Sequence, residues 1–182
     1  MTARPGYAQA LRATRLLDLL HAYDPRIAGT PPLGVDLPAS DIDVLCHAPD
    51  ALAFTRTAWE ALAGMTAFAI HQWTGDERPV IATFSAHGWC FEIFASIRPV
   101  SEQAGWRHFV VERRLLALGG EPFRGNVMRH RRAGLKTEPA FATALRLKGD
   151  PYQALLELHR HTDGDLAAIL AAAGYPTHSG QS

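Results

Sequence analysis

The chain has 182 residues, of which 47% are hydrophobic and 20% are charged. This length and composition are typical of a globular protein with a sizeable core. Because the formal net charge is zero, no global electrostatic field indicates nucleic acid or a membrane surface as the partner.

The N-terminal part is predicted to form a helix, a short strand and a stiff loop. Leucines form a helical stripe over residues 7–22, and Asp24-Pro25 ends it. A short strand over 27–28 leads into Gly29-Thr30. Three prolines and a glycine predict a loop over 31–38. Charged residues interrupt every apolar run near the N-terminus, so we expect neither a signal peptide nor a membrane span.

The middle of the chain is predicted to be a sheet with one helix. A strand over 41–46 precedes a helix that Asp50 caps and Gly64 ends. Three more strands are predicted over 66–73, 80–85 and 89–95, with glycines at the turns. Mixed strands with a helix between them predict an α/β sheet covered by helices on one face.

After Pro99 the pattern changes to helices. Ser101 is the predicted N-cap of the first helix, and Gly119-Gly120 ends it. Further helices begin at Glu121-Pro122, Thr137-Glu138-Pro139 and Asp150-Pro151. We therefore expect a single domain over residues 7–161, with an α/β core over 7–98 and a helical part over 99–161. Residues 162–182 are expected to form a short helix and a flexible tail.

Asp41 and Asp43 are the first candidate functional residues. Side chains alternate along a strand, so both aspartates project from the same face. Two carboxylates about 4 Å apart repel by roughly 4 kcal/mol at an effective dielectric of 20. A divalent cation removes that repulsion, and oxygen ligands suit Mg²⁺. The Gly29-Thr30 turn would offer backbone N–H groups and a hydroxyl to a phosphate. The alternative is a solvated acidic face of an edge strand.

Glu92 is the third candidate carboxylate. Its strand would bury Phe91 and Ile93 on one face and turn Cys90, Glu92 and Phe94 to the other. An exposed phenylalanine would be unusual, which favours a cleft over open solvent at this face.

The two cysteines do not form a disulfide framework. Cys90 shares a strand face with Glu92, whereas Cys46 lies opposite Asp41 and Asp43. If the acids converge, the two thiols point away from each other and cannot pair. A reducing, cytoplasmic location is therefore expected.

Ala28-Gly29-Thr30, followed after ten residues by Asp41-Ile42-Asp43-Val44, resembles the signature of the DNA polymerase β-type nucleotidyltransferase superfamily. That signature is a hydrophobic residue, glycine, serine or threonine, a similar gap, and then carboxylates alternating with hydrophobic residues. A third carboxylate on a later strand completes it, and Glu92 matches that place. The resemblance implies a minimal nucleotidyltransferase fold: a mixed sheet with helices on one face, followed by a helical C-terminal half.

The chain is more closely similar to a small bacterial family of nucleotidyltransferase-like proteins of unknown function, from about Tyr7 to Leu158. The matching segments are Gly34-Val35-Asp36, Trp106-Arg107-His108, Arg113-Arg114-Leu115-Leu116, Gly119-Gly120, Leu135-Lys136-Thr137-Glu138-Pro139-Ala140-Phe141-Ala142 and Gly149-Asp150-Pro151-Tyr152.

The superfamily resemblance implies transfer of a nucleoside monophosphate, AMP from ATP first, to a hydroxyl acceptor with release of pyrophosphate. Asp41 and Asp43 would hold two Mg²⁺ ions, for which Mn²⁺ could substitute. Glu92 would bind the metal next to the acceptor hydroxyl and help to deprotonate it. Gly29 and Thr30 would position the β- and γ-phosphates.

Lys136 and Arg107 are matched in the resembling family, so they could contact the phosphates or the acceptor. Ordinary solvation at helix ends explains them equally well. His108 is either a polar anchor or, more simply, a structural histidine that forms hydrogen bonds.

The neutral charge and small size favour a small-molecule acceptor. The alternatives are adenylylation of a protein in a toxin–antitoxin-like system, and a fold used only for binding nucleotide or protein.

Overall fold

The structure is a computed structural model that describes residues 4–176. The chain divides into two compact units. The first comprises the residues up to Pro32 together with Pro38–Trp106, and the second comprises Leu33–Leu37 and the residues from Arg107 onward. Among the described residues, no helix is long and apolar enough to cross a membrane.

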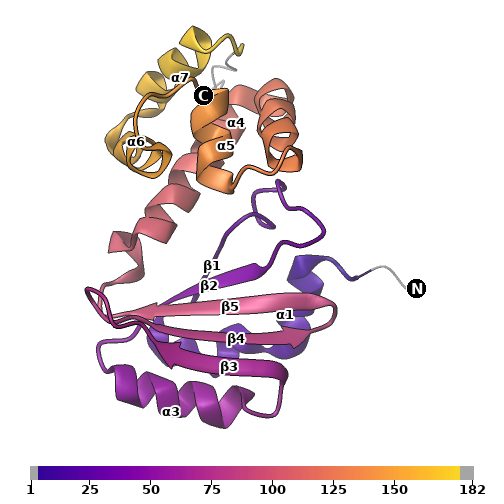
Figure 1. Cartoon of the computed structure of the whole chain (residues 1–182), viewed down its shortest axis with the longest axis vertical. Coiled ribbons are helices and arrows are strands. Elements are labelled where there is room, and N and C mark those ends of the chain that lie inside the picture. The colour runs from indigo at the N-terminus through magenta and orange to yellow at the C-terminus, as the bar shows by residue number, and fades with distance from the viewer. Residues whose placement is uncertain (1–3, 177–182) are drawn as a thin grey trace. The chain divides into compact units, whose positions relative to one another are not determined.

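The first unit is built on a five-stranded mixed sheet in the order β1-β2-β5-β4-β3 (Figure 1). The strands are β1 (Arg26–Ala28), β2 (Ile42–His47), β3 (Thr66–Gln72), β4 (Val80–Ala86) and β5 (Trp89–Ser96). β2 and β5 are parallel, whereas the other neighbours are antiparallel. Parallel neighbours need a long connection, which residues 48–88 provide here.

Helices cover one face of this sheet, as predicted (Figure 1). They are α1 (Tyr7–Thr14), α2 (Leu16–Leu19) and α3 (Ala51–Leu62). Their apolar side chains pack against alternate strand residues in one core, which includes Leu16, Leu20, Phe54, Leu62, Ile42, Val44, Phe84, Phe91 and Ile93. The other face carries the intervening residues of β2 and β5, and we call it the open face.

The predicted helix over 7–22 is interrupted, so the expectation of one continuous helix is wrong. Arg15 adopts a left-handed φ of 53° between α1 and α2, and the 3-10 turn η1 (His21–Tyr23) follows. Leu16 and Leu20 are nevertheless fully buried. The leucine stripe thus reports burial correctly, although the backbone bends within it.

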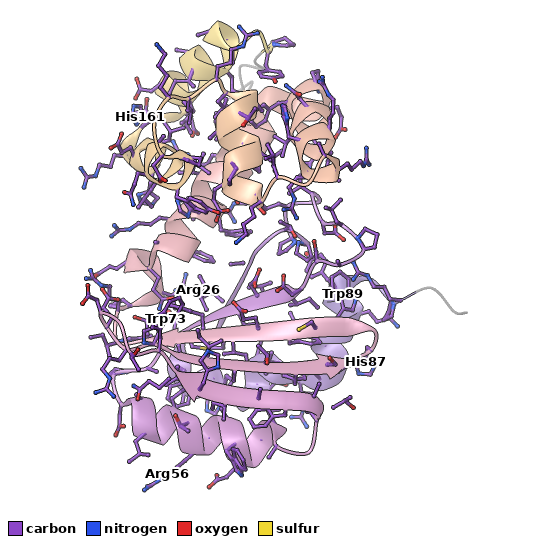
Figure 2. The ribbon with its side chains drawn as sticks, viewed as in Figure 1. Arg26, Arg56, Trp73, His87, Trp89 and His161 are labelled. Atoms are coloured by element: carbon purple, nitrogen blue, oxygen red, sulfur yellow. The ribbon has the colours of Figure 1, made fainter. Side chains whose placement is uncertain are left out.

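Trp89 begins β5 and fixes the N-terminal segment to the sheet (Figure 2). Its indole N–H donates a hydrogen bond to the carbonyl oxygen of Pro5 at 2.8 Å. The guanidinium of Arg4 lies 3.5 Å from the indole ring centroid, a cation–π contact.

Of the two predicted helix caps, Asp50 is confirmed and Ser101 is wrong. The Asp50 carboxylate accepts hydrogen bonds from the backbone N–H groups of Leu52 and Ala53, at 2.9 and 3.0 Å. The Asp150 carboxylate accepts one from Gln153 at 2.9 Å. Ser101 is not a cap of the long helix, because it lies within the 3-10 turn η2 (Val100–Glu102), after which α4 begins at Ala104.

The second unit is helical. Its helices are α4 (Ala104–Arg132, which begins in the first unit), α5 (Thr137–Ala144), α6 (Pro151–Glu157), η3 (Leu158–Arg160) and α7 (Asp163–Ala172). The predicted break at Gly119-Gly120 is present, since Gly120 has a φ of 58° and a ψ of −157° within α4. A Cβ on Gly119 would lie 2.6 Å from Cβ of Phe123, so glycine permits close packing there. Residues 177–182 of the predicted tail lie outside the described residues.

Glu112 is buried in the second unit. It is 4% exposed, and its Oε1 has no hydrogen-bond partner among the described residues. Burial raises the pKa of Glu112 well above its ordinary value, the Glu138 carboxylate raises it further, and Arg131 opposes both. Folding therefore favours the uncharged carboxyl group.

We expect Glu112→Gln to raise the melting temperature by an amount that grows with pH. The folded state raises the pKa of Glu112, so folding is stabilised when this carboxyl group is uncharged. That stabilisation is complete below the unfolded-state pKa and is lost as the pH rises through the folded-state pKa. Glutamine has a similar shape and does not ionise.

Thermal melts of both proteins between about pH 5 and pH 8 measure this difference. Glu157→Gln is the matched control, because Glu157 is exposed on α6 and should show no such trend. A difference between Glu112→Gln and the wild type that is constant with pH would contradict the interpretation.

Candidate functional site

The structure brings the three predicted carboxylates onto the open face of the first unit's sheet. Asp43 of β2 is the register partner of Glu92 on the parallel strand β5. Register partners project to the same face from strands about 4.8 Å apart. Asp41 lies just before β2 rather than within it, and its charge acts on both Glu92 and Cys90, which places it near them. Ile42 and Phe91, on the opposite face, are fully buried.

Gly29 packs directly beneath the Asp43 carboxylate. β1 pairs antiparallel with β2, and Ala28 is the register partner of Asp43. Gly29, the next residue, has a φ of 74°. A Cβ at this position would overlap Oδ2 of Asp43 and lie 2.9 Å from its Cγ. Both the backbone conformation and the close approach therefore require glycine.

Thr30 is buried, and its hydroxyl donates a hydrogen bond to Oγ of Ser40 at 3.2 Å. This bond joins the two ends of the loop between β1 and β2. The Thr30 hydroxyl can donate to a phosphate only by exchanging its bond to Ser40.

Burial and neighbouring carboxylates raise the pKa values of two groups on this face, Glu92 and Cys90. Burial raises the pKa of Glu92, Asp41 raises it further, and His71 opposes the shift. Cys90 is exposed, but partial desolvation still raises the pKa of its thiol. The carboxylates of Asp41, Glu92 and Asp43, in that order, raise this pKa further. The acids and the thiol thus occupy one negatively charged patch, whereas Cys46 is buried in the core, where its pKa is raised to about 12.

The donor chemistry of this face fits a magnesium ion. Carboxylate oxygens are ligands that Mg²⁺ prefers, and it commonly takes its remaining ligands from phosphates and water. Across residues 4–176, no three His, Cys, Asp or Glu side chains form a ready-made metal site. The fit therefore rests on the shared face of the acids and on the repulsion that a cation would relieve.

The other predicted residues belong to the second unit. Lys136 is exposed at the start of α5, and Arg107 is half-buried on α4, so their contribution to the same site stays a prediction. Nε2 of His108 lies 3.0 Å from the carbonyl oxygen of Tyr152, and Nδ1 lies 3.8 Å from the Glu138 carboxylate. With 8% exposure, His108 has the environment of a structural histidine.

Sequence reasoning missed Ser40 and His71. Ser40 accepts the hydrogen bond from Thr30, and His71 on β3 favours the charged form of Glu92. The alternation within the predicted strand 66–73 indicates that His71 shares a face with Ala69, but not which strands lie beside it.

Comparison with solved structures defines the class of fold. In the GLD-2/RNP-8 complex, a chain that is 12% identical aligns with a TM-score of 0.53 over 88% of this chain and 75% of that chain. The Cid1 poly(U) polymerase with bound MgGTP is 14% identical and aligns with a TM-score of 0.52 over 80% of this chain. A cytoplasmic RNA terminal U-transferase, also 14% identical, aligns over 80% of this chain with a TM-score of 0.50.

The chain spans only 46% of the poly(U) polymerase chain and 41% of the U-transferase chain. These similarities define a polymerase β-like nucleotidyltransferase fold, which confirms the predicted fold class. The chain belongs to the family DUF4269, a domain of unknown function, which matches residues 9–158. A search of curated proteins finds no match.

Proposed function

We propose that this protein transfers a nucleoside monophosphate from a nucleoside triphosphate, ATP first among them, to a hydroxyl group of a small molecule. The observation that carries this proposal is the register pairing of Asp43 with Glu92, with Gly29 packed against the Asp43 carboxylate. The names of the similar structures, a poly(U) polymerase and a terminal U-transferase, support nucleotidyl transfer in general.

The three carboxylates would have different roles in the reaction. Asp41 and Asp43 would hold Mg²⁺ with Glu92, and the bound metal would neutralise charge that develops on the phosphates. Glu92 would accept the proton of the acceptor hydroxyl, because burial and Asp41 make it a stronger base than an ordinary glutamate. The acceptor oxygen then bonds to the α-phosphorus as the bond to pyrophosphate breaks.

The phosphates would be held by the turn after β1. Gly29 lets the turn pack against the Asp43 carboxylate, where backbone N–H groups of the turn would donate to a phosphate, and Thr30 would add its hydroxyl. Lys136 and Arg107 would add positive charge to the phosphates or the acceptor.

The zero net charge favours a small-molecule acceptor over a polynucleotide, since nucleic-acid binding depends mainly on cationic contacts to phosphates. To test this, the protein would be incubated with Mg²⁺, each nucleoside triphosphate and cell extract, and the products examined by mass spectrometry. A nucleoside monophosphate on a small molecule would support the proposal, and one on a protein would support adenylylation of a protein partner. If no nucleotide forms an adduct, nucleotidyl transfer is contradicted. The remaining interpretation is then a fold that only binds nucleotide or protein.

We expect Mg²⁺ with a nucleoside triphosphate to raise the melting temperature of the wild type, because ligands that bind only the folded state stabilise it. At one hundred times Kd the gain is about 2.7 kcal/mol. For a chain of this size, that gain corresponds to roughly 5–10 °C. The double substitution Asp41→Asn/Asp43→Asn should abolish the shift.

Asp18→Asn is the control, since Asp18 is an exposed acid on α2, and it should keep the full shift. Without nucleotide, the double variant should melt no lower than the wild type, because it loses a repulsion between carboxylates. An undiminished ligand shift in the double variant would place the nucleotide elsewhere.

A further inference from the structure

Asp41 is the one proposed metal ligand that the sheet itself does not hold. Asp43 and Glu92 are register partners on neighbouring strands, whereas Asp41 precedes β2, which begins at Ile42. Asp41 therefore ends the loop between β1 and β2, which contains no helix or strand. Because loop backbones are more mobile than the elements they connect, a carboxylate at this position needs other contacts to keep it in place.

The side chain of Arg4 supplies such contacts to the end of this loop. Its Nη1 donates a hydrogen bond to the carbonyl oxygen of Pro38 at 2.8 Å and a longer one to that of Ser40 at 3.4 Å. A charged guanidinium forms stronger hydrogen bonds than a neutral donor. The Ser40 carbonyl and the Asp41 N–H belong to one planar peptide group, so a bond to that carbonyl also restrains the backbone of Asp41.

Arg4 is in turn held by the start of β5. Its guanidinium lies 3.5 Å from the Trp89 ring centroid, and the same indole donates its N–H to the Pro5 carbonyl at 2.8 Å. Trp89 is 4% exposed and belongs to the core of the first unit. Gly88 permits the close approach, because a Cβ there would lie 3.1 Å from Cβ of Arg4. A chain of contacts thus runs from the core through Trp89 and Arg4 to the residue before Asp41.

These contacts meet at the end of β5 that lies beside the acids. Partial desolvation is the largest cause of the raised pKa of the Cys90 thiol, and Asp41 contributes the most among the carboxylates. Because Cys90 follows Trp89, the Asp41 carboxylate lies near the same end of β5. Arg4, Trp89 and both ends of the loop all belong to the first unit. The arrangement is therefore complete within that unit.

We propose that Arg4 is a positioning residue of the candidate site, which holds the end of the β1–β2 loop so that Asp41 faces the metal together with the other two carboxylates. Arg4 acts through the Pro38 and Ser40 carbonyl groups and contacts neither metal nor nucleotide. Its effect on nucleotide binding rests on the proposed function, whereas its effect on the loop requires neither nucleotide nor metal.

Arg4→Ala removes the guanidinium and leaves the Trp89 ring open to a free guanidinium ion. In NMR relaxation measurements without nucleotide or Mg²⁺, the amide order parameters of Ser40 and Asp41 should fall from about 0.85 to below about 0.6, while Asp43 within β2 stays rigid. Mg²⁺–ATP should bind at least about tenfold more weakly, as when a group that orients a metal ligand is lost. Millimolar guanidinium chloride should restore both the order parameters and the affinity.

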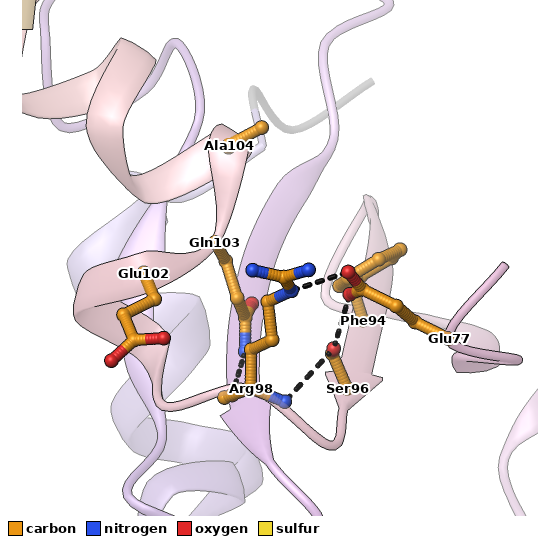
Figure 3. Close-up of a pocket in the computed structure, with 8 residues that line it drawn as sticks. Glu77, Phe94, Ser96, Arg98, Glu102, Gln103 and Ala104 are labelled. Carbon is orange, nitrogen blue, oxygen red and sulfur yellow. Dashed lines mark hydrogen bonds and ion pairs between the residues drawn. The ribbon is translucent and has the colours of Figure 1, made fainter.

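Arg98→Ala is the matched control, because Arg98 follows the opposite end of β5. There it lines a pocket of about 310 Å³ and pairs with the Glu77 carboxylate (Figure 3). Its backbone is held independently of its side chain, since its N–H donates to Oγ of Ser96 at 3.2 Å and its carbonyl accepts from Nε2 of Gln103 at 3.0 Å. Arg98→Ala should keep the wild-type order parameters and nucleotide affinity, with or without guanidinium.

The positioning role is overturned if Ser40 and Asp41 stay rigid in Arg4→Ala, if Arg98→Ala loses as much nucleotide affinity, or if guanidinium restores neither measurement. Loosened amides with an unchanged affinity for Mg²⁺–ATP would also overturn it, because the loop would then not position the site. If the wild type binds no nucleoside triphosphate with Mg²⁺, the proposed function is wrong, and the order parameters alone decide whether Arg4 holds the loop.

Discussion

Glu92→Gln is expected to release pyrophosphate at least about a hundredfold more slowly than the wild type while binding Mg²⁺–nucleotide with nearly the same affinity. Glutamine keeps the size and one carbonyl oxygen of Glu92 but loses its charge and basicity. In the proposed site, nucleotide affinity would depend mostly on Asp41, Asp43 and the Gly29 turn, which the substitution leaves in place. The loss of a proposed metal ligand would add to the loss of the proposed base, because charge in the transition state would then be less well neutralised.

The pH dependence provides a second measurement. A base must be deprotonated to act, so the wild-type rate should fall as the pH is lowered through the pKa of Glu92. In the metal-free protein, burial and Asp41 raise that pKa above the ordinary 4.5, and a bound Mg²⁺ would lower it. This acidic limb should be absent from the residual activity of Glu92→Gln. Cys90→Ser is the matched control, because it changes the same face without removing a carboxylate, and it should stay close to the wild type. Wild-type pyrophosphate release by Glu92→Gln would show that the third carboxylate is misassigned.

Gly29→Ala is expected to weaken Mg²⁺–nucleotide binding by at least about tenfold, although it adds only one methyl group. That methyl group would overlap Oδ2 of Asp43, so either the carboxylate or the β1 turn must move. Since Asp43 is a proposed metal ligand and the turn a proposed phosphate contact, either movement disturbs the site. Isothermal titration with nucleotide and Mg²⁺ measures the loss, and circular dichroism checks that the unit is folded.

Gly134→Ala separates backbone strain from this clash. Gly134 also has a positive φ, of 97°, but a Cβ there would meet nothing within 4 Å. Both substitutions carry the cost of placing alanine in a left-handed conformation, about 1 kcal/mol. Only Gly29→Ala meets the Asp43 carboxylate, so only Gly29→Ala should lose nucleotide binding. Equal nucleotide affinities in the two variants would remove the Gly29 turn from the site.

Local sequence features predicted much of the first unit. The alternation of Asp41, Ile42, Asp43 and Val44 indicated both a strand and its buried face, and the structure buries Ile42 and Val44 completely. Asp50 was recognisable as a cap because a carboxylate before an apolar helix satisfies the first N–H groups. Such features depend on a few neighbouring residues, which is why one sequence suffices to read them.

Features that depend on distant contacts could not be predicted in the same way. The pairing of Asp43 with Glu92 requires β5 to insert between β2 and β4, and strand order is not encoded in alternation. The bend at Arg15 interrupts a continuous leucine stripe without a proline or glycine. Gln103 was not singled out, because its role depends on carbonyl groups of Cys46 and Arg98 that only the fold brings to it. Residue spacing singled out Asp41, Asp43 and Glu92 as a predicted site, whereas no spacing pattern indicated the contacts of Gln103.

The position of Cys90 gives the open face a natural attachment point. The chain has two cysteines, and the fold buries Cys46 while leaving Cys90 exposed. A fluorophore or nitroxide coupled to the unaltered protein would therefore sit beside Asp41, Asp43 and Glu92, with no engineered residue. Because the thiolate is the reactive form and the three carboxylates oppose its formation, the coupling rate itself depends on how much negative charge that face carries.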